Sequence, residues 1–393
     1  MNMEADKSKI LLYNANGEPL RYSNKQSKDN HLDDVKKKLK SQIPEDKIVL
    51  PSALKMVEKL NKNVYGHFYA KKKLALALKG AEQRINFPKI GMEKSNMLFY
   101  GDTGCGKSWL IENLAKITNL PLIKVNMTGI SSTGYVGGSF DDVFEKLIDR
   151  NDASFDMDEY LMLLEDGEMD DIPLKQNAPY AIVHIDEIDK IANRSFGSNG
   201  FNEDLQNELI GYVENSEILN GLLNTNNMTF IGTGRFYGLE EIVLSRLNKK
   251  SSIGFSSNVK QNVSNYSQSE LFSYVQPIDL IKYGFRPELV GRFPISFGIN
   301  SLSVEDLEGI LDIKTSYLSK KRKMFKEAYD INLRFTKAAK KQIAQFAKQT
   351  STNARGLKSA IENVLEDFEF HAADYRGKTV VFDKDIESLL YKK

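Results

Sequence analysis

The segment Gly101–Ser108 reads Gly-Asp-Thr-Gly-Cys-Gly-Lys-Ser and matches the pattern G-x-x-x-x-G-K-[ST] at every fixed position. Its glycines let the backbone turn with the N–H groups pointing inward, so that the loop can wrap around phosphate oxygens. An apolar run, Asn96–Tyr100, precedes the loop, and residues 109–117 follow it with helical spacing. This order of strand, loop and helix places phosphates at the positive N-terminus of a helix. The sequence therefore predicts an α/β nucleotide-binding domain.

Two side chains of this loop suit the binding of a nucleoside triphosphate. Lys107 is predicted to hold the β and γ phosphates, and the Ser108 hydroxyl is predicted to ligate Mg²⁺. We therefore expect ATP and Mg²⁺ as cofactors. The residues expected to contact the nucleotide are Asp102, Thr103, Gly104, Cys105, Gly106, Lys107, Ser108 and Trp109.

The segment Ala181–Glu187 has the pattern of a buried strand that ends in two carboxylates. A parallel sheet binds its ligand at the carboxyl ends of the strands, so Asp186 would reach the same edge as the loop. We predict that Asp186 assists Mg²⁺ and that Glu187 polarises the water that attacks the γ phosphate. Taken alone, an Asp-Glu pair after a strand is often only the start of a helix. The loop earlier in the chain favours the functional interpretation.

The segment Met228–Thr233 has the pattern of the next parallel strand. The end of this strand can bring Thr233 beside the γ phosphate. An ordinary turn residue explains Thr233 almost equally well, so both interpretations stay open at this point.

The hydrophobic pattern divides the chain into three parts. Residues 1–50 are polar, and we expect them to form an N-terminal extension. Residues 51–300 are expected to form a large ATPase domain, and residues 301–393 are expected to form a small, mainly helical lid domain. Helices are predicted at 51–60, 70–85, 304–328, 337–348 and 354–373, and a strand at 379–382. A hairpin is predicted around Asn16-Gly17, and a surface insertion in the acidic stretch 151–176.

The composition argues against several classes of protein. With 54 basic and 53 acidic residues the net charge is +1, whereas proteins dominated by nucleic-acid backbone contacts usually carry a basic excess. Cys105 is the only cysteine, so one chain cannot form a disulfide framework or a cysteine zinc site. No apolar run is long enough to span a membrane, and the charged start does not fit a signal peptide. We expect a soluble protein of the reducing cytoplasm without a membrane partner.

From about residue 51 to residue 382, the sequence resembles the ClpX-type AAA+ protein unfoldases, hexameric ATPases that feed proteins into the ClpP peptidase. The resemblance depends on several motifs in the family's order. They are Val64-Tyr-Gly-His67, Gly101–Ser108, Gly134-Tyr-Val-Gly137, Ile185-Asp-Glu-Ile-Asp-Lys190, Ile253-Gly-Phe255, Asp279-Leu-Ile-Lys-Tyr-Gly284, Gly291-Arg292 and Ala354-Arg-Gly-Leu357. This likeness implies an AAA+ P-loop NTPase large domain with a parallel sheet, a small helical lid domain, and a homo-oligomeric ring, expected as a hexamer.

The resemblance also implies roles around the nucleotide. Val64 and Tyr65 match the loop that contacts adenine. Arg292 matches the arginine that reaches the γ phosphate of the neighbouring subunit, and Arg355 matches the lid arginine that senses nucleotide in its own chain. A guanidinium stabilises the charge on transferring phosphate. Considered singly, each arginine is more often an ordinary surface residue.

Two further motifs imply contacts with other proteins. Tyr135 and Val136 match the family's axial pore loop, where an aromatic and an aliphatic side chain grip polypeptides of any sequence. Strand core is the alternative, but the flanking glycines argue against a buried strand. Ile253, Gly254 and Phe255 match the loop that docks on ClpP. Scattered exposed apolar residues are also common, so that alternative stays open.

The sequence departs from the family pattern in four places, one of which is the acidic stretch 152–171, an insertion relative to the family. The family commonly carries a four-cysteine zinc domain before the ATPase domain, and a chain with one cysteine is expected to lack it. The second pore loop of the family bears a basic cluster, whereas the corresponding segment, about Glu214–Asn226, is shorter and has no basic residue. Arg235 replaces a small residue. Recognition of substrates and adaptors is therefore expected to differ.

The resulting prediction is an ATP-dependent protein unfoldase that threads polypeptides through the pore of a ring and delivers them to a ClpP-like peptidase. Its expected substrates are unfolded or tagged proteins. A remodeller that works without a peptidase is the alternative within the same class, and the Ile253–Phe255 motif argues against it. A nucleic-acid motor is the alternative of another class; the near-neutral charge and the uncharged Tyr-Val pore tip argue against that one.

Overall fold

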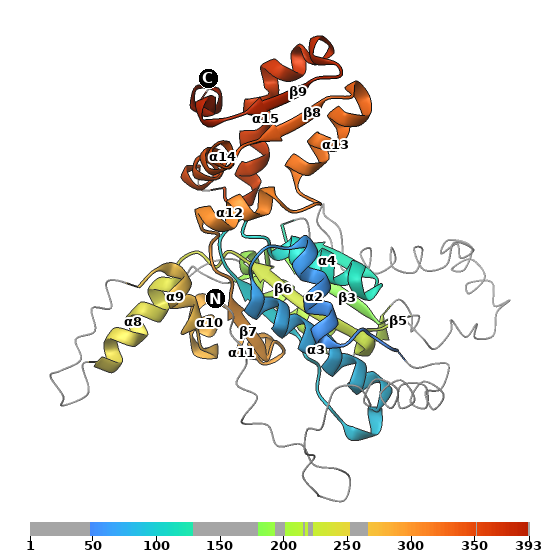
Figure 1. Ribbon diagram of the computed structural model, residues 1–393. Coiled ribbons are helices and arrows are strands. Elements are labelled where there is room, and N and C mark those ends of the chain that lie inside the picture. The colour runs from blue at the N-terminus through green and yellow to red at the C-terminus, as the bar shows by residue number, and fades with distance from the viewer. Residues whose placement is uncertain are drawn as a thin grey trace, which may run out of the picture. The chain divides into compact units, whose positions relative to one another are not determined.

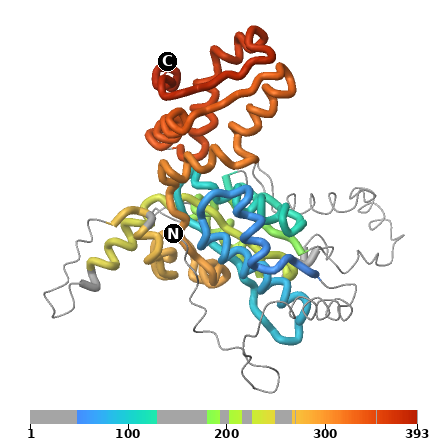
Figure 2. The backbone as a smooth tube through the Cα atoms, in the orientation of Figure 1, coloured from blue at the N-terminus to red at the C-terminus, as the bar shows by residue number. Residues whose placement is uncertain are grey.

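The computed structural model describes residues 48–128, 180–192, 201–214, 217–218, 223–251, 266–350 and 352–391, all within the unit Ile48–Lys393. Figure 2 shows the course of the chain through these residues in colour. Several predicted features lie outside this part of the chain: the hairpin near Asn16, the acidic stretch, the pore residues Tyr135 and Val136, and the docking residues Ile253, Gly254 and Phe255.

Five parallel strands form one sheet in the order β2-β3-β6-β1-β7 (Figure 1). Their bounds are β1 Met97–Tyr100, β2 Leu122–Asn126, β3 Ala181–Asp186, β6 Met228–Gly234 and β7 Ile295–Gly298. Because β1 lies between β6 and β7, the loop that follows it emerges from the interior of the sheet. Asp186 on β3 is the register partner of Thr233 on β6, so both lie toward the carboxyl ends of their strands, at the same side of the sheet. The predicted α/β class with a parallel sheet is confirmed.

The two faces of the sheet carry separate apolar cores because side chains alternate along each strand. Met97 and Phe99 of β1 belong to the core with α2 (Ala53–Asn63), α3 (Phe68–Asn86) and α4 (Lys107–Thr118). Leu98 and Tyr100 point the other way, into the core with α7 (Phe201–Val213) and the helices that follow it. The helices predicted at 51–60 and 70–85 are thus present as α2 and α3.

Short elements complete the large domain. They are η2 Pro88–Ile90, η3 Ile188–Ile191, β4 Glu217–Ile218, β5 Leu223–Asn224, η4 Thr225–Asn227, α8 Leu239–Ser251, α9 Gln268–Ser273, α10 Pro277–Tyr283 and α11 Pro287–Gly291. β4 and β5 pair as an antiparallel hairpin. Helices α9 to α11 have 6, 7 and 5 residues, and two turns or fewer display no clear period of 3.6. The sequence pattern therefore did not predict them.

A mainly helical group follows, with a core of its own that extends from Leu302 to Leu390. Its elements are α12 Val304–Leu311, α13 Tyr317–Tyr329, β8 Asn332–Phe335, α14 Lys337–Gln349, α15 Ala354–Phe370, η6 Ala372–Tyr375, β9 Thr379–Phe382, η7 Lys384–Ile386 and α16 Glu387–Leu390. The single helix predicted at 304–328 is wrong. Ser316 begins a new helix there, because its hydroxyl accepts a hydrogen bond from the N–H of Ser319 at 3.1 Å. Strand β8 pairs in parallel with the predicted strand β9.

Across the described ranges, none of the helices combines the length and apolar character needed to cross a membrane.

Candidate nucleotide-binding site

The loop Gly101–Ser108 joins β1 to α4, as the sequence predicted. Gly104 and Gly106 have φ values of 74° and 95°, in the left-handed region that favours glycine. A Cβ added to Gly104 would come within 2.3 Å of the carbonyl oxygen of Thr352. The loop is therefore compact, and the backbone of the small domain packs directly against it.

Polar groups around the loop fix its shape. The ammonium of Lys107 donates to the carbonyl oxygens of Gly101, at 2.7 Å, and Asp102, at 2.9 Å. Nε2 of His67 lies 2.7 Å from the carbonyl oxygen of Cys105. Burial lowers the pKa of His67 and raises that of the Cys105 thiol, so both side chains are neutral near pH 7. Lys107 thus lies within the predicted phosphate cradle, and His67 is a supporting residue to which the sequence assigned no role.

Asp186 is held by hydroxyl groups on both of its oxygens. Ser108 donates to Oδ2 at 3.2 Å, and Thr233 donates to Oδ1 at 2.8 Å. Burial alone would raise the pKa of Asp186, but these hydrogen bonds and the nearby ring of His184 hold it below its ordinary value. The predicted magnesium residues are therefore adjacent, and Thr233 lies within β6, not in a turn, and contacts the carboxylate.

Behind Thr233 lies the buried ring of His184, with Nε2 2.8 Å from the Thr233 hydroxyl. A hydroxyl has one hydrogen, and that of Thr233 is donated to Asp186. The Thr233 oxygen must therefore accept from His184, so Nε2 of the ring carries the proton. Burial lowers the pKa of His184 to about 4, which keeps the ring neutral at pH 7. His184 thereby orients the hydroxyl that orients Asp186.

Glu187 follows β3 in a left-handed conformation, with φ 57° and ψ 35°. Its N–H donates to Oδ1 of Asp186 at 3.1 Å. A residue with a Cβ pays about 1–2 kcal/mol for this conformation, so the surrounding contacts must hold the turn. One of them is Asp189, whose Oδ2 accepts from the N–H of Phe236 at 3.2 Å. The half-buried Glu187 is thus fixed at the edge of the sheet beside the phosphate loop.

A cavity of about 210 Å³ lies beside the loop and includes the residues predicted to contact adenine. Tyr65 packs against Gly309, where an added Cβ would come within 2.4 Å of its ring. Nε1 of Trp109 donates to the carbonyl oxygen of Asn63 at 3.2 Å. The lining comprises Asn63, Val64, Tyr65, His67, Cys105, Gly106, Trp109, Leu302, Ile310, Ile313, Thr315, Ser316, Tyr317 and Ala354. A largely apolar pocket between a loop and two domains suits a planar base.

The small domain contacts the phosphate loop at the start of α15. Asn353 donates from Nδ2 to the carbonyl oxygen of Thr103 at 2.9 Å, and the N–H of Ala354 donates to that of Gly104 at 3.2 Å. A third bond joins the Ser301 hydroxyl to the Asp102 carboxylate. Arg355 is the next residue of α15 and is exposed. The predicted lid arginine therefore follows directly after the backbone that contacts the loop.

Arg292 lies at the opposite end of β1 from the phosphate loop. Its carbonyl oxygen accepts from Nδ2 of Asn96, the residue just before β1, at 3.1 Å, and its guanidinium pairs with Glu214. A strand of four residues extends about 13 Å. The structure therefore does not bring Arg292 to the phosphate loop of its own chain.

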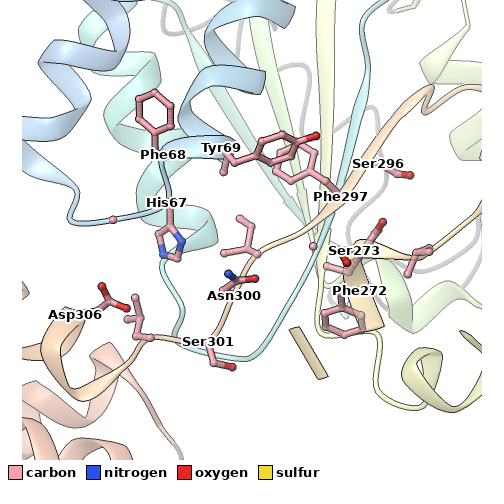
Figure 3. Close-up of a pocket in the computed structure, with 17 residues that line it drawn as sticks. His67, Phe68, Tyr69, Phe272, Ser273, Ser296, Phe297, Asn300, Ser301 and Asp306 are labelled. Carbon is pink, nitrogen blue, oxygen red and sulfur yellow. The ribbon is translucent and has the colours of Figure 1, made fainter. Parts of the chain in front are cut away.

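A second and larger cavity has a volume of about 530 Å³. Figure 3 shows residues that line it. His67, Phe68 and Tyr69 line it from the start of α3, Phe297 from β7, and Ser301 from the segment before α12. None of the residues that line it within the described chain belongs to Gly101–Ser108. Its lining thus differs from that of the nucleotide site, although His67 and Leu302 border both cavities.

Comparison with known proteins agrees with this geometry. The family described as AAA domain (Cdc48 subfamily) matches residues 92–296, and the C-terminal, D2-small domain of ClpB protein matches residues 302–368. The ATP-dependent Clp protease ATP-binding subunit ClpX of Treponema denticola is 33% identical over 353 residues, covering 84% of this chain and 79% of the relative. The subunit of the same name from Borrelia duttonii is 32% identical over 362 residues, covering 86% and 78%. The chain belongs to the ClpX-type family of AAA+ Clp ATPase chaperones.

Proposed function

We propose that this ATPase is a protein unfoldase of the cytoplasm. It uses Mg²⁺ as a cofactor and assembles into a ring, expected as a hexamer. It pulls unfolded or tagged polypeptides through its pore and delivers them to a ClpP-like peptidase. The observation that carries the proposal is the group formed by Ser108, Asp186 and Thr233 beside the phosphate loop. This group supplies the site at which ATP hydrolysis can be coupled to movement of the small domain.

The oxygens of Ser108 and Asp186 fit a magnesium site. They lie 3.2 Å apart, and Mg²⁺ prefers oxygen ligands, usually one or two carboxylates supplemented by phosphates and water. The metal would neutralise charge on the phosphates. Ser108 and Asp186 would hold it, and Thr233 would keep the carboxylate in place.

Glu187 is the proposed base that orients the attacking water. Its backbone is fixed by the bond to Asp186, so its side chain starts from a defined point at the edge of the sheet. Lys107 is the proposed phosphate ligand, and its ammonium already lies within the loop, on the carbonyl oxygens of Gly101 and Asp102. Together they position a nucleophile and a γ phosphate, which is most of what phosphoryl transfer requires of a protein.

The position of Arg292 supports a site shared between subunits. Since Arg292 lies at the other end of β1 from its own phosphate loop, and this strand extends about 13 Å, it is available to a neighbouring chain. We propose that it stabilises the γ phosphate of that neighbour, whereas Arg355 acts within its own chain. Hydrolysis would then require assembly into a ring.

Coupling to protein substrates is proposed through the small domain. Three hydrogen bonds link Asp102, Thr103 and Gly104 to residues of the small domain or the segment before it, so a change in the loop is transmitted to that domain. We propose that this movement displaces Tyr135 and Val136 along the pore. The relatives named as ATP-binding subunits of the Clp protease support a peptidase partner, which we assign to Ile253, Gly254 and Phe255.

The test is to measure ATP hydrolysis by the purified protein with and without a denatured protein, DNA and a barrel-shaped peptidase. We expect stimulation by the denatured protein, none by DNA, and degradation only with the peptidase. A Phe255→Ala variant should lose degradation but keep ATPase activity and unfolding, since small losses multiply around a ring. If Phe255→Ala supports degradation as the parent does, the docking assignment is wrong. Stimulation by DNA instead of protein would contradict the unfoldase proposal itself.

A further inference from the structure

The ammonium of Lys94 binds both ends of the hairpin formed by β4 and β5. It donates to the carbonyl oxygens of Val213 at 3.0 Å, Glu214 at 2.6 Å and Thr225 at 2.9 Å. The hydroxyl of Thr225 also donates to the carbonyl oxygen of Glu214 at 2.8 Å. Lys94 therefore caps the C-terminal end of α7, where a cation is favoured, and closes the base of the hairpin.

The surroundings of Lys94 are largely desolvated. Its Nζ lies 5.4 Å from the centroid of the Phe230 ring. Burial, aided by the cations Arg84 and Arg292, lowers the pKa of Lys94 to about 7, while Glu214 acts in the opposite direction. Arg84 fixes the same end of the hairpin, since it donates to Oδ1 of Asn226 at 2.7 Å and to the carbonyl oxygen of Asn226 at 2.5 Å. The three carbonyl oxygens match the three N–H donors of the charged form, so these contacts favour the ammonium against its burial.

Glu214 connects Lys94 and its carbonyl acceptors to Arg292. Its carboxylate pairs with Nη2 of Arg292, and the two side chains are 42% and 51% exposed. The backbone of Arg292 is fixed separately by Asn96, whose Oδ1 accepts from the N–H of Phe230 at 3.0 Å. Arg292 is therefore anchored at its backbone by the sheet and at its side chain by the end of α7.

We propose that Glu214 and Lys94 are positioning residues for Arg292: Lys94 fixes the end of α7, and Glu214 holds the guanidinium in the direction of the neighbouring subunit. This inference rests on the proposed role of Arg292 at a shared site. The ion pair engages Nη2 of Arg292, and the planar fork of arginine offers further N–H donors for a phosphate. Because the arginine side chain is flexible, a fixed partner reduces the conformational entropy that the side chain loses when it binds that phosphate.

The main test is a Glu214→Gln variant, which keeps the shape of the side chain and removes its charge. We expect kcat for ATP to fall roughly 10-fold, within the range of about 10²-fold that a misplaced catalytic group can cost. KM for ATP and the melting temperature should stay unchanged, because a half-exposed ion pair contributes little to stability. Glu203→Gln is the matched control: Glu203 lies on α7, the helix that Glu214 directly follows, and pairs with Arg286, at 3.5 Å, instead of Arg292. It should hydrolyse ATP as the parent does.

A second measurement separates positioning from a general structural effect. In an Arg292→Ala background, Glu214→Gln should cause no further loss of kcat, since the group that it positions is absent. Lys94→Met should lower kcat in the parent and likewise have no added effect in that background. Equal kcat in parent and Glu214→Gln, or full additivity with Arg292→Ala, would overturn the inference. If Arg292→Ala itself hydrolyses ATP normally, the proposed shared site fails instead.

Discussion

The hydroxyl of Thr233 donates to Oδ1 of Asp186 at 2.8 Å, and the two residues are register partners on adjacent parallel strands. Oδ2 of the same carboxylate faces Ser108 at 3.2 Å. Asp186 is thus oriented by β6 on one side and by α4 on the other. The carboxylate proposed to assist Mg²⁺ does not have to be ordered when the metal binds, which favours binding.

Thr233→Val removes this hydroxyl with little change in shape. We expect the Mg²⁺ concentration for half-maximal binding of an ATP analogue to rise about 10-fold, as for the loss of a group that orients a metal ligand. Titration of Mg²⁺ against a fluorescent analogue measures it. Thr233→Ser should behave as the parent, and so should Thr229→Val, which removes a hydroxyl bonded to Tyr180 elsewhere on the same strand. An unchanged Mg²⁺ titration for Thr233→Val would show that Thr233 has no such role.

Glu187→Gln should bind ATP and assemble as the parent does but lose turnover. Amide and carboxylate have the same shape, so the turn after β3 is kept, while the group that polarises water is lost. One catalytic base contributes about 10² to 10⁴ in rate. Steady-state hydrolysis, with nucleotide affinity and sedimentation as controls, measures the effect. Hydrolysis at the parental rate would remove Glu187 from the mechanism.

Mixing two variants that each retain only a residual rate of hydrolysis tests the shared site. Arg292→Ala subunits keep an intact Glu187, and Glu187→Gln subunits keep an intact Arg292. Some interfaces in a mixed ring therefore pair intact halves, and we expect partial recovery of hydrolysis over a series of mixing ratios. Co-assembly without recovery at any ratio counts against a role of Arg292 in a neighbouring subunit.

Because Lys71 is buried, we expect the free energy of unfolding to depend on pH in the alkaline range. The buried ammonium donates to Oδ1 of Asn61 at 2.8 Å and to the carbonyl oxygen of Val64 at 2.7 Å, and burial lowers its pKa to about 8. Between about pH 8 and pH 10.5 the unfolded chain holds a proton on Lys71 that the folded chain does not, so the free energy of unfolding rises with pH there. This contribution is present above pH 10.5 and is lost as the pH falls to about 8.

The size of this effect is at most about 3 to 4 kcal/mol, since the pKa falls by about 2.5 units and one unit corresponds to about 1.4 kcal/mol. Urea denaturation at several pH values should show a smaller rise for Lys71→Met than for the parent. Lys72→Met, which changes an exposed neighbour on the same helix, serves as the control and should keep the parental rise. Identical pH profiles for Lys71→Met and the parent would contradict the assignment.

Tyr135→Ala should leave basal ATP hydrolysis largely intact while the unfolding of a folded reporter protein falls steeply. The reason is that Tyr135 is proposed to touch the polypeptide and not the nucleotide. Parallel measurement of hydrolysis and of reporter fluorescence separates the two activities. If unfolding proceeds at the parental rate, Tyr135 has no part in gripping the substrate.

The sequence by itself determined the elements whose signals are local. The glycines of Gly101–Ser108 and the apolar run before them predict the strand, loop and helix, because φ preferences and side-chain alternation act within a few residues. The same holds for β3, which ends at Asp186. Helices α2, α3, α14 and α15 are long enough for their period to be visible. The split of 304–328 at Ser316 was missed, because a capping serine resembles any other polar residue in a helical pattern.

Only the tertiary structure decided which side chains meet. Lys94 reaches Glu214 across 120 positions, and Asn353 reaches Thr103 across 250. Those contacts follow from the strand order, which places β1 between β6 and β7, and from the packing of α15 on the phosphate loop. Neither depends on local periodicity, since loop closure and long-range packing set them. The bond between Thr233 and Asp186 has the same origin: Asp186 ends β3, Thr233 is the second-last residue of β6, and only the register of β3 against β6 makes them partners.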